Sequence, residues 1–173
     1  DMENSGLLFG DRLAEAVRQK KSVAVVGIDP TPAMFPLDLA ERAKEGTAGL
    51  HSALSDFSLG IVTSVMDVVP AIKPNIAFFE AFGLHGLSVY KSVCLAAASA
   101  GMLGIGDGKR GDIGSTAAAY AQGLLDAPRV GLDELANTTD NDTFQEKIGG
   151  LLGPHDALTL SPYLGSDSIK PFI

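Results

Sequence analysis

The sequence is short of basic residues, and this shortage excludes several kinds of partner. Lys and Arg number 13 against 21 Asp and Glu, which gives a formal net charge of -8 at neutral pH. A surface that binds nucleic acid or an anionic membrane needs clustered cations, so neither partner is expected. A local basic pocket for a small phosphorylated molecule remains compatible with this composition.

Cysteine occurs once and long apolar runs are missing. The single cysteine, Cys94, cannot form an internal disulfide, and a reducing, cytoplasmic setting fits it. No run reaches the about 18 apolar residues of a transmembrane helix, so none is predicted. The first residues lack the basic-then-apolar order of a signal peptide. With 173 residues, of which 46% are hydrophobic, the chain is long enough for one domain with a sizeable core.

Several motifs of common enzyme classes are also missing. There is no Gly-x4-Gly-Lys-Ser/Thr phosphate loop and no Gly-x-Ser-x-Gly nucleophile elbow. The three histidines, His51, His85 and His155, have no metal-ligand spacing, so no metal site is predicted. Residues 106–111 match the dinucleotide-binding Gly-x-Gly-x-x-Gly pattern, but Asp107 within it would repel a pyrophosphate. These patterns therefore predict neither a metal site nor a bound dinucleotide.

What the sequence does contain is an alternation of short apolar runs and helical patterns. The valine-rich run 22–28 is typical of a strand that is buried on both faces. Repeated strand–helix order predicts a parallel sheet with right-handed crossovers, and hence an α/β fold in a single domain. The predicted strands are 22–28, 68–73, 102–106 and 157–160. The predicted helices are 9–20, 37–67 with a possible break near Gly60, 76–82, 84–100, 113–125, 143–152 and 166–173.

Polar residues follow each predicted strand. Asp29, Lys73, Asp107, Lys109 and Ser161 all stand at or just beyond a strand end. Ligands bind at the carboxyl ends of parallel strands, so these side chains are candidates for one site. The charged residues among them also have simpler explanations, namely a structural ion-pair network for Asp107 and Lys109, a solvated strand end for Lys73 and a turn for Asp29.

The segment 106–116 is the most informative part of the chain. Asp107 and Lys109 stand two apart, so on a strand they point to the same face. Asp112 opens the next helix, which it or Ser115 could cap. Three charges on one wall are costly to desolvate. Such a cluster is therefore expected where a site handles protons or charge that develops on a substrate.

The pattern Asp107-x-Lys109-x-x-Asp112-Ile113-Gly114-x-Thr116 resembles the signature of the orotidine 5'-phosphate decarboxylase family. Segments 26–30, 72–75 and 160–165 agree with it in order and context. The last two, with 107–112, look like the bacterial branch that has longer chains. The resemblance implies a TIM (β/α)8 barrel, of which about four βα units are present, with 1–173 as the N-terminal part of a single barrel domain.

The resemblance also implies an activity, namely decarboxylation of orotidine 5'-phosphate to UMP in pyrimidine biosynthesis without a cofactor. The implied catalytic residues are Lys73, Asp107, Lys109 and Asp112, with Lys109 protonating C6 of the pyrimidine as CO2 leaves. In the family the last aspartate and the nearby threonine reach into a neighbouring subunit, so a homodimer is expected. The implied substrate-binding residues are Asp29, Lys73, Asn75, Ile113, Thr116 and Ser161.

The chain departs from this family in length. A TIM barrel typically needs about 250 residues and eight strands, whereas four strands are predicted here. The phosphate-gripping loop of the family comes after the later strands and has no counterpart, so we expect the isolated chain to lack appreciable decarboxylase activity. The role of 127–156 is not indicated by any pattern.

Two other functions remain open at this point. A magnesium-dependent phosphosugar decarboxylase or lyase of the same superfamily would share Asp-x-Lys-x-x-Asp, although Ile113-Gly114-Ser115-Thr116 favours the orotidine enzyme. A non-catalytic nucleotide-binding half-barrel is the alternative from a different class.

Overall fold

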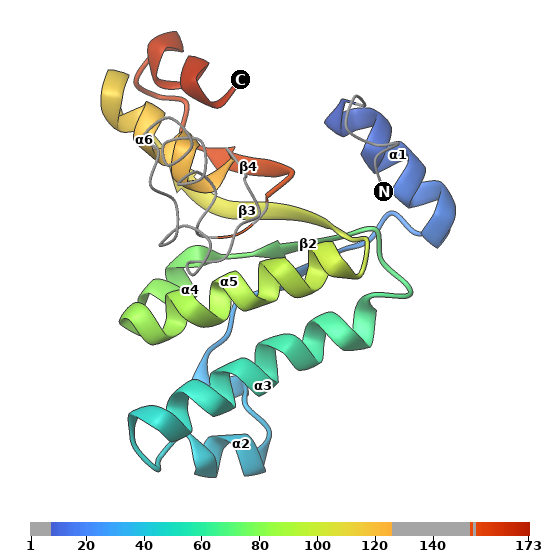
Figure 1. The fold of residues 1–173 in the computed structure, drawn as a ribbon, viewed down its shortest axis with the longest axis vertical. Coiled ribbons are helices and arrows are strands. Elements are labelled where there is room, and N and C mark those ends of the chain that lie inside the picture. Colours follow the sequence, from blue (N-terminus) through green and yellow to red (C-terminus); the bar gives the residue numbers. More distant parts are fainter. Residues whose placement is uncertain (1–7, 126–152, 154) are drawn as a thin grey trace, which may run out of the picture.

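The computed structural model describes residues 8–125, 153 and 155–173 (Figure 1). Its strands are β1 (Val25–Ile28), β2 (Ala71–Pro74), β3 (Leu103–Arg110) and β4 (Ala157–Leu160). Its α-helices are α1 (Phe9–Lys20), α2 (Leu37–Arg42), α3 (Thr47–Val65), α4 (Ile76–Glu80), α5 (Gly83–Ser99) and α6 (Gly114–Leu124). Short 3-10 turns span Pro32–Met34, Ser166–Ser168 and Lys170–Phe172.

The strands form a parallel sheet whose spatial order, β1-β2-β3-β4, is the order in the chain. Val26 pairs with Ile72, and Ile72 in turn pairs with Gly104. An isolated bridge between Asn75 and Asp107 continues the β2–β3 pairing beyond the carboxyl end of β2. The predicted α/β architecture with parallel strands is therefore confirmed.

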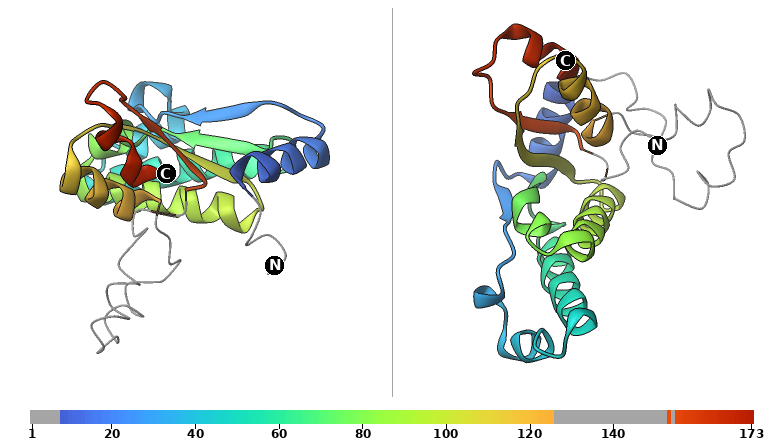
Figure 2. Two further views of the ribbon diagram at one scale, coloured as in Figure 1. Left: turned by 90° about the horizontal axis from the view of Figure 1, so that it is seen from above. Right: turned by 90° about the vertical axis from the view of Figure 1, so that its left-hand side faces the viewer.

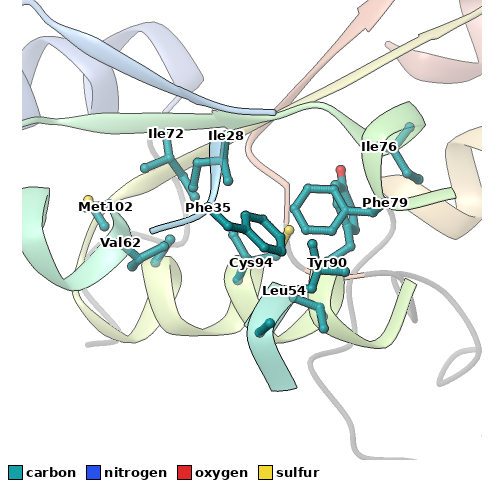
Figure 3. Close-up of a cluster of buried hydrophobic side chains, with 14 of the residues drawn as sticks. Ile28, Phe35, Leu54, Val62, Ile72, Ile76, Phe79, Tyr90, Cys94 and Met102 are labelled. Carbon is teal, nitrogen blue, oxygen red and sulfur yellow. The ribbon is translucent and has the colours of Figure 1, made fainter. Parts of the chain in front are cut away.

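The hydrophobic core lies between the strands and the helices that follow them. Figure 3 shows Ile28 and Ile72 pointing from β1 and β2 toward Cys94 and Tyr90 on α5. Leu54 of α3 lies in the same cluster, and all five side chains are essentially inaccessible to solvent. Their burial in one layer fixes the strand ends, and so the polar residues that follow them. Cys94 is a free cysteine that is buried on α5.

The predicted break near Gly60 was wrong, because the helical region 37–67 is interrupted earlier, between α2 and α3. Gly46 has φ 92° and stands at the N-cap of α3. Gly49 lies so close to the carbonyl of Arg42 that a Cβ there would collide with it. Two glycines thus permit a tight turn between the helices, whereas Gly60 lies inside a continuous α3.

Other local expectations also need correction. β1 is not buried on both faces, since Val25 is 43% exposed. The N-cap of α6 is Ile113 without a side-chain hydrogen bond, so neither Asp112 nor Ser115 caps that helix. The segment 166–173 forms two short 3-10 helices rather than an α-helix. The predicted helix 143–152 lies outside the described residues.

Helix α1 is attached at the amino ends of β3 and β4. Arg12 forms an ion pair with Asp156, which stands just before β4 and also accepts a hydrogen bond from the Gly104 N–H at 2.7 Å. In the left view of Figure 2, α1 (dark blue) lies at one end of the strands, away from the red C-terminal turns. The polar side chains described below lie at the opposite, carboxyl end of the strands. Among the described helices, none combines the length and apolarity needed to cross a bilayer.

Candidate active site

Asp107 on β3 is the centre of a charged cluster built from three neighbouring strands. Its Oδ2 accepts a hydrogen bond from Lys73 Nζ of β2 at 2.6 Å. Its Oδ1 accepts from Lys109 Nζ of β3 at 2.6 Å and from Thr159 Oγ1 of β4 at 2.8 Å. The carboxylate is 5% exposed, while the two lysines reach toward solvent. The predicted meeting of Lys73, Asp107 and Lys109 at the carboxyl ends of the strands is what the geometry shows.

The surroundings of Asp107 keep it ionised. Burial on its own would raise its pKa, but the hydrogen bonds from Lys109, Lys73 and Thr159 outweigh burial and lower the pKa to about 2. Two ammonium groups around one carboxylate leave the cluster with a net positive charge. Such a site can attract an anionic substrate, and its lysines can donate a proton or stabilise charge that develops on a nearby atom.

The backbone at Lys109 is unusual. Its φ is 45°, in the left-handed region that residues with a side chain seldom adopt. The β3–β4 register shifts between Gly106 and Arg110, as in a β-bulge. The peptide N–H of Lys109 donates to Thr159 Oγ1 at 3.0 Å, and its carbonyl accepts from Ser161 Oγ at 3.2 Å. Hydroxyls of the next strand therefore hold the irregular backbone of Lys109 on both sides.

Three other predicted site residues lie at the same edge without joining the ion pairs. Asn75 caps α4 by accepting from the Ala77 N–H, and its backbone bridges to Asp107. Ser161 bonds to the backbone of Lys109 and Arg110. Asp29 is exposed one residue after β1, and among the described residues its carboxylate forms no ion pair with Lys73.

Asp112 stands apart from the cluster. Its carboxylate accepts from the neighbouring Ile113 N–H at 2.8 Å, and no bond joins it to Lys73 or Lys109 within the described part of the chain. Ile113 is 60% exposed, and Thr116 is exposed on the first turn of α6. Among the described residues, the predicted tetrad thus divides into three residues joined by hydrogen bonds and a fourth, Asp112, that is not bonded to them.

Two residues of this region were not predicted from the sequence. Thr159 bonds directly to Asp107 and Lys109, and its only sequence signal is a hydroxyl inside an apolar strand, on the same face as Ser161. Arg110 donates to Glu80 at 2.8 Å, and its guanidinium carbon lies 5.1 Å from the ring centre of Tyr120. It therefore ties the end of β3 to α4 and α6.

The described residues contain no group of three or more His, Cys, Asp or Glu side chains placed to hold a metal ion. His155 is buried, and both of its ring nitrogens form hydrogen bonds.

A parallel sheet in chain order, with acid–base side chains at the carboxyl ends of its strands, is the arrangement of an α/β protein whose strands form part of a (β/α)8 barrel. Residues 23–131 match the family model described as Orotidine 5'-phosphate decarboxylase / HUMPS family. This chain belongs to that family.

Known proteins resemble the chain over nearly all of its length. Orotidine 5'-phosphate decarboxylase of Rhodopirellula baltica is 35% identical over 171 residues, which are 96% of this chain and 50% of that protein. The Streptomyces coelicolor enzyme of the same name is 38% identical over 168 residues, 95% of this chain and 49% of that one. The chain thus spans about half the length of the curated relatives it matches.

Solved structures also match nearly all of this chain but only part of their own length. A putative orotidine 5'-phosphate decarboxylase from Streptomyces avermitilis has a TM-score of 0.67 at 32% identity, covering 99% of this chain and 51% of that one. Leishmania donovani UMP synthase has a TM-score of 0.66 at 30% identity, covering 96% and 27%. The chain therefore carries about four βα units of the barrel, as expected.

Proposed function

We propose that this chain supplies the proton-donating half of an orotidine 5'-phosphate decarboxylase. The observation that carries the proposal is the buried Asp107 carboxylate with Lys109 and Lys73 each 2.6 Å from it, at the carboxyl ends of the strands in a chain of this family. The remaining half of the barrel would complete the pocket, since this chain spans only about half the length of the relatives it matches.

The proposed reaction breaks the bond between C6 of the pyrimidine and its carboxylate. CO2 leaves, the bonding electron pair stays at C6, and a proton from Lys109 Nζ forms the new C–H bond of UMP. The neutral amine of Lys109 then takes a proton from solvent. The ionised Asp107 holds the ammonium groups of Lys73 and Lys109, and it would repel the substrate's carboxylate.

The energetics require more than this cluster. An ammonium about 4 Å from a developing carbanion contributes roughly 4 kcal/mol at an effective dielectric constant near 20. Enzymes lower barriers by up to about 23 kcal/mol or more, so binding energy from the ribose and phosphate must contribute as well. We therefore infer that this chain alone is a poor catalyst, because the phosphate site belongs to the other half of the barrel.

The other predicted residues take their proposed roles from the family. Asp29 and Lys73 would bind ribose hydroxyls, and Asn75 and Ser161 would contact substrate. Asp112, Ile113 and Thr116 would act in the neighbouring subunit of a homodimer. Ile113 and Thr116 are exposed at the start of α6, and the Asp112 carboxylate bonds to the Ile113 N–H rather than to the lysines at Asp107, which supports this division. A cytoplasmic location remains a prediction.

A metal-dependent phosphosugar reaction is the second candidate, since the matching family includes HUMPS proteins. Its metal would need free oxygens on Asp107. Both oxygens already accept hydrogen bonds, Oδ2 from Lys73 and Oδ1 from Lys109 and Thr159. A carboxylate with at most about one lone-pair site left is a poor metal ligand, which favours the metal-free reaction.

The test is turnover of orotidine 5'-phosphate by this chain alone and by this chain combined with the portion of the Streptomyces coelicolor relative that it does not cover. We expect the combination to release CO2 in the presence of a chelator, and the chain alone to be nearly inactive. Lys109→Ala should remove activity by many orders of magnitude, whereas Lys44→Ala, at an exposed lysine paired with Glu41, should not.

Three results would contradict the proposal. Turnover that requires magnesium would favour the phosphosugar reaction. An inactive combination that still binds UMP, with only a modest loss of affinity in Lys109→Ala, would indicate a nucleotide-binding module. Full activity of the chain alone would refute the need for a second half.

A further inference from the structure

We propose that Thr159 is a positioning residue, whose hydroxyl holds the backbone of Lys109 and the carboxylate of Asp107 in their reactive arrangement. This inference deepens the proposed function and rests on it. Thr159 belongs to β4, one strand away from the two residues it holds.

The direction of each hydrogen bond at Thr159 follows from chemistry. The peptide N–H of Lys109 can only donate, so Thr159 Oγ1 accepts from it at 3.0 Å. The ionised carboxylate of Asp107 can only accept, so the single hydroxyl proton points to Oδ1 at 2.8 Å. One hydroxyl therefore joins the backbone of the proposed proton donor to the carboxylate at the centre of the site.

Lys109 has a particular need for such a contact. Its φ of 45° is unfavourable for a residue with a side chain and persists only where surrounding contacts enforce it. Thr159 holds its N–H, Ser161 holds its carbonyl at 3.2 Å, and the Ser161 N–H bonds to the next carbonyl, that of Arg110, at 2.7 Å. Of these contacts, only that of Thr159 also reaches a charged group of the site.

The shared oxygen gives Thr159 a chemical effect beyond support. Lys109 Nζ and Thr159 Oγ1 bond to the same Oδ1 of Asp107. The hydroxyl takes up part of the negative charge on that oxygen, so the ammonium is held less exclusively by the carboxylate. Loss of the hydroxyl should raise the pKa of Asp107 and move the Lys109 ammonium from its position for proton transfer.

The experiment compares Thr159→Val, which keeps the shape but not the hydroxyl, with Thr159→Ser, which keeps the hydroxyl. Thr63→Val is the matched control, because Thr63 is exposed on α3 and its hydroxyl bonds only to helix carbonyls. Kinetics use the combination that turns over orotidine 5'-phosphate. NMR titration of the Asp107 carboxyl carbon and hydrogen exchange of the Lys109 amide use the full chain and need no turnover.

We expect Thr159→Val to lower kcat by about ten- to a hundredfold, the loss of one hydrogen bond to a charged group, with KM changed by less than about threefold. The Asp107 pKa should rise and exchange at the Lys109 amide should accelerate. Thr159→Ser should restore all three quantities, and Thr63→Val should leave them unchanged.

Equal changes in kcat for the Val and Ser variants, or an unchanged Asp107 pKa and Lys109 exchange in Thr159→Val, would overturn the inference. If Thr159→Val does not fold, Thr159→Ala replaces it, and failure of both would assign Thr159 to stability instead. Absence of turnover in the wild type contradicts the proposed function only, because the two NMR measurements still decide whether Thr159 holds Lys109 and Asp107.

Discussion

Tyr90 and His155 meet inside the protein, with the Tyr90 hydroxyl 2.7 Å from Nε2 of the imidazole. The other ring nitrogen, Nδ1, lies 2.8 Å from the carbonyl oxygen of Leu124. Because a carbonyl only accepts, Nδ1 carries the proton and Nε2 accepts from Tyr90. Burial lowers the pKa of His155 and raises the pKa of the neighbouring Cys94 thiol to about 12, so both stay neutral. The neutral network links α5, the end of α6 and the start of β4.

Replacing His155 should therefore destabilise the fold. In His155→Phe, the Tyr90 hydroxyl and the Leu124 carbonyl remain buried without their partner, and we expect the free energy of unfolding to fall by about 1–3 kcal/mol. Urea denaturation of the full chain measures it. His85→Phe is the control, because His85 is exposed on α5 and should change stability by less than about 0.5 kcal/mol. Equal stability of the two variants would show that the network contributes nothing.

The same histidine should make stability depend on pH near neutrality. Its pKa is lower in the folded than in the unfolded chain, so the unfolded chain binds more protons as the pH falls. The contribution of neutral His155 to the free energy of unfolding is complete above the ordinary histidine pKa of about 6.5 and is lost progressively below it. Urea midpoints measured from pH 8 to 5 should decline in the wild type and decline less in His155→Gln. A parallel decline in both would assign the effect to other groups.

A second pH window belongs to Asp107. Its pKa falls from an ordinary 3.8 to about 2, so its ionisation stabilises the fold above pH about 4, and this contribution disappears as the pH falls toward 2. A shift of this size corresponds to about 2 kcal/mol. Thermal unfolding between pH 5 and 2 should show a steeper loss in the wild type than in Asp107→Asn. The exposed Asp38→Asn, on α2, should keep the wild-type slope. A flat wild-type profile would contradict the ion-paired geometry.

Much of this architecture follows from local sequence patterns, because strands such as Ala157–Leu160 combine apolar runs with flanking turn residues. The pairing of Asp107 with Lys109 was predictable from their spacing on one strand face. The role of Thr159 was not, since it depends on the β3–β4 register, which a bulge shifts between Gly106 and Arg110. The turn at Gly46 was missed because the helical periodicity of 37–67 does not encode the close approach of Gly49 to the carbonyl of Arg42.

Two helical glycines allow a matched test of the packing itself. Gly86 on α5 faces α4, where an added Cβ would collide with the carbonyl of Phe79 and lie 2.9 Å from Phe82 Cβ. Gly60 is exposed on α3, and an added Cβ there meets nothing within 4 Å. Neither glycine is in the left-handed region, so the two positions differ mainly in the space around them.

Opposite outcomes are expected from the same substitution. Gly86→Ala should lower the free energy of unfolding by about 1–3 kcal/mol, because the backbones of α4 and α5 must separate. Gly60→Ala should raise it by about 0.5–1 kcal/mol, since alanine loses less conformational entropy in a helix. Urea denaturation of both variants against the wild type measures the two signs. A tolerated Gly86→Ala would mean that the backbones of α4 and α5 are not held as closely as described.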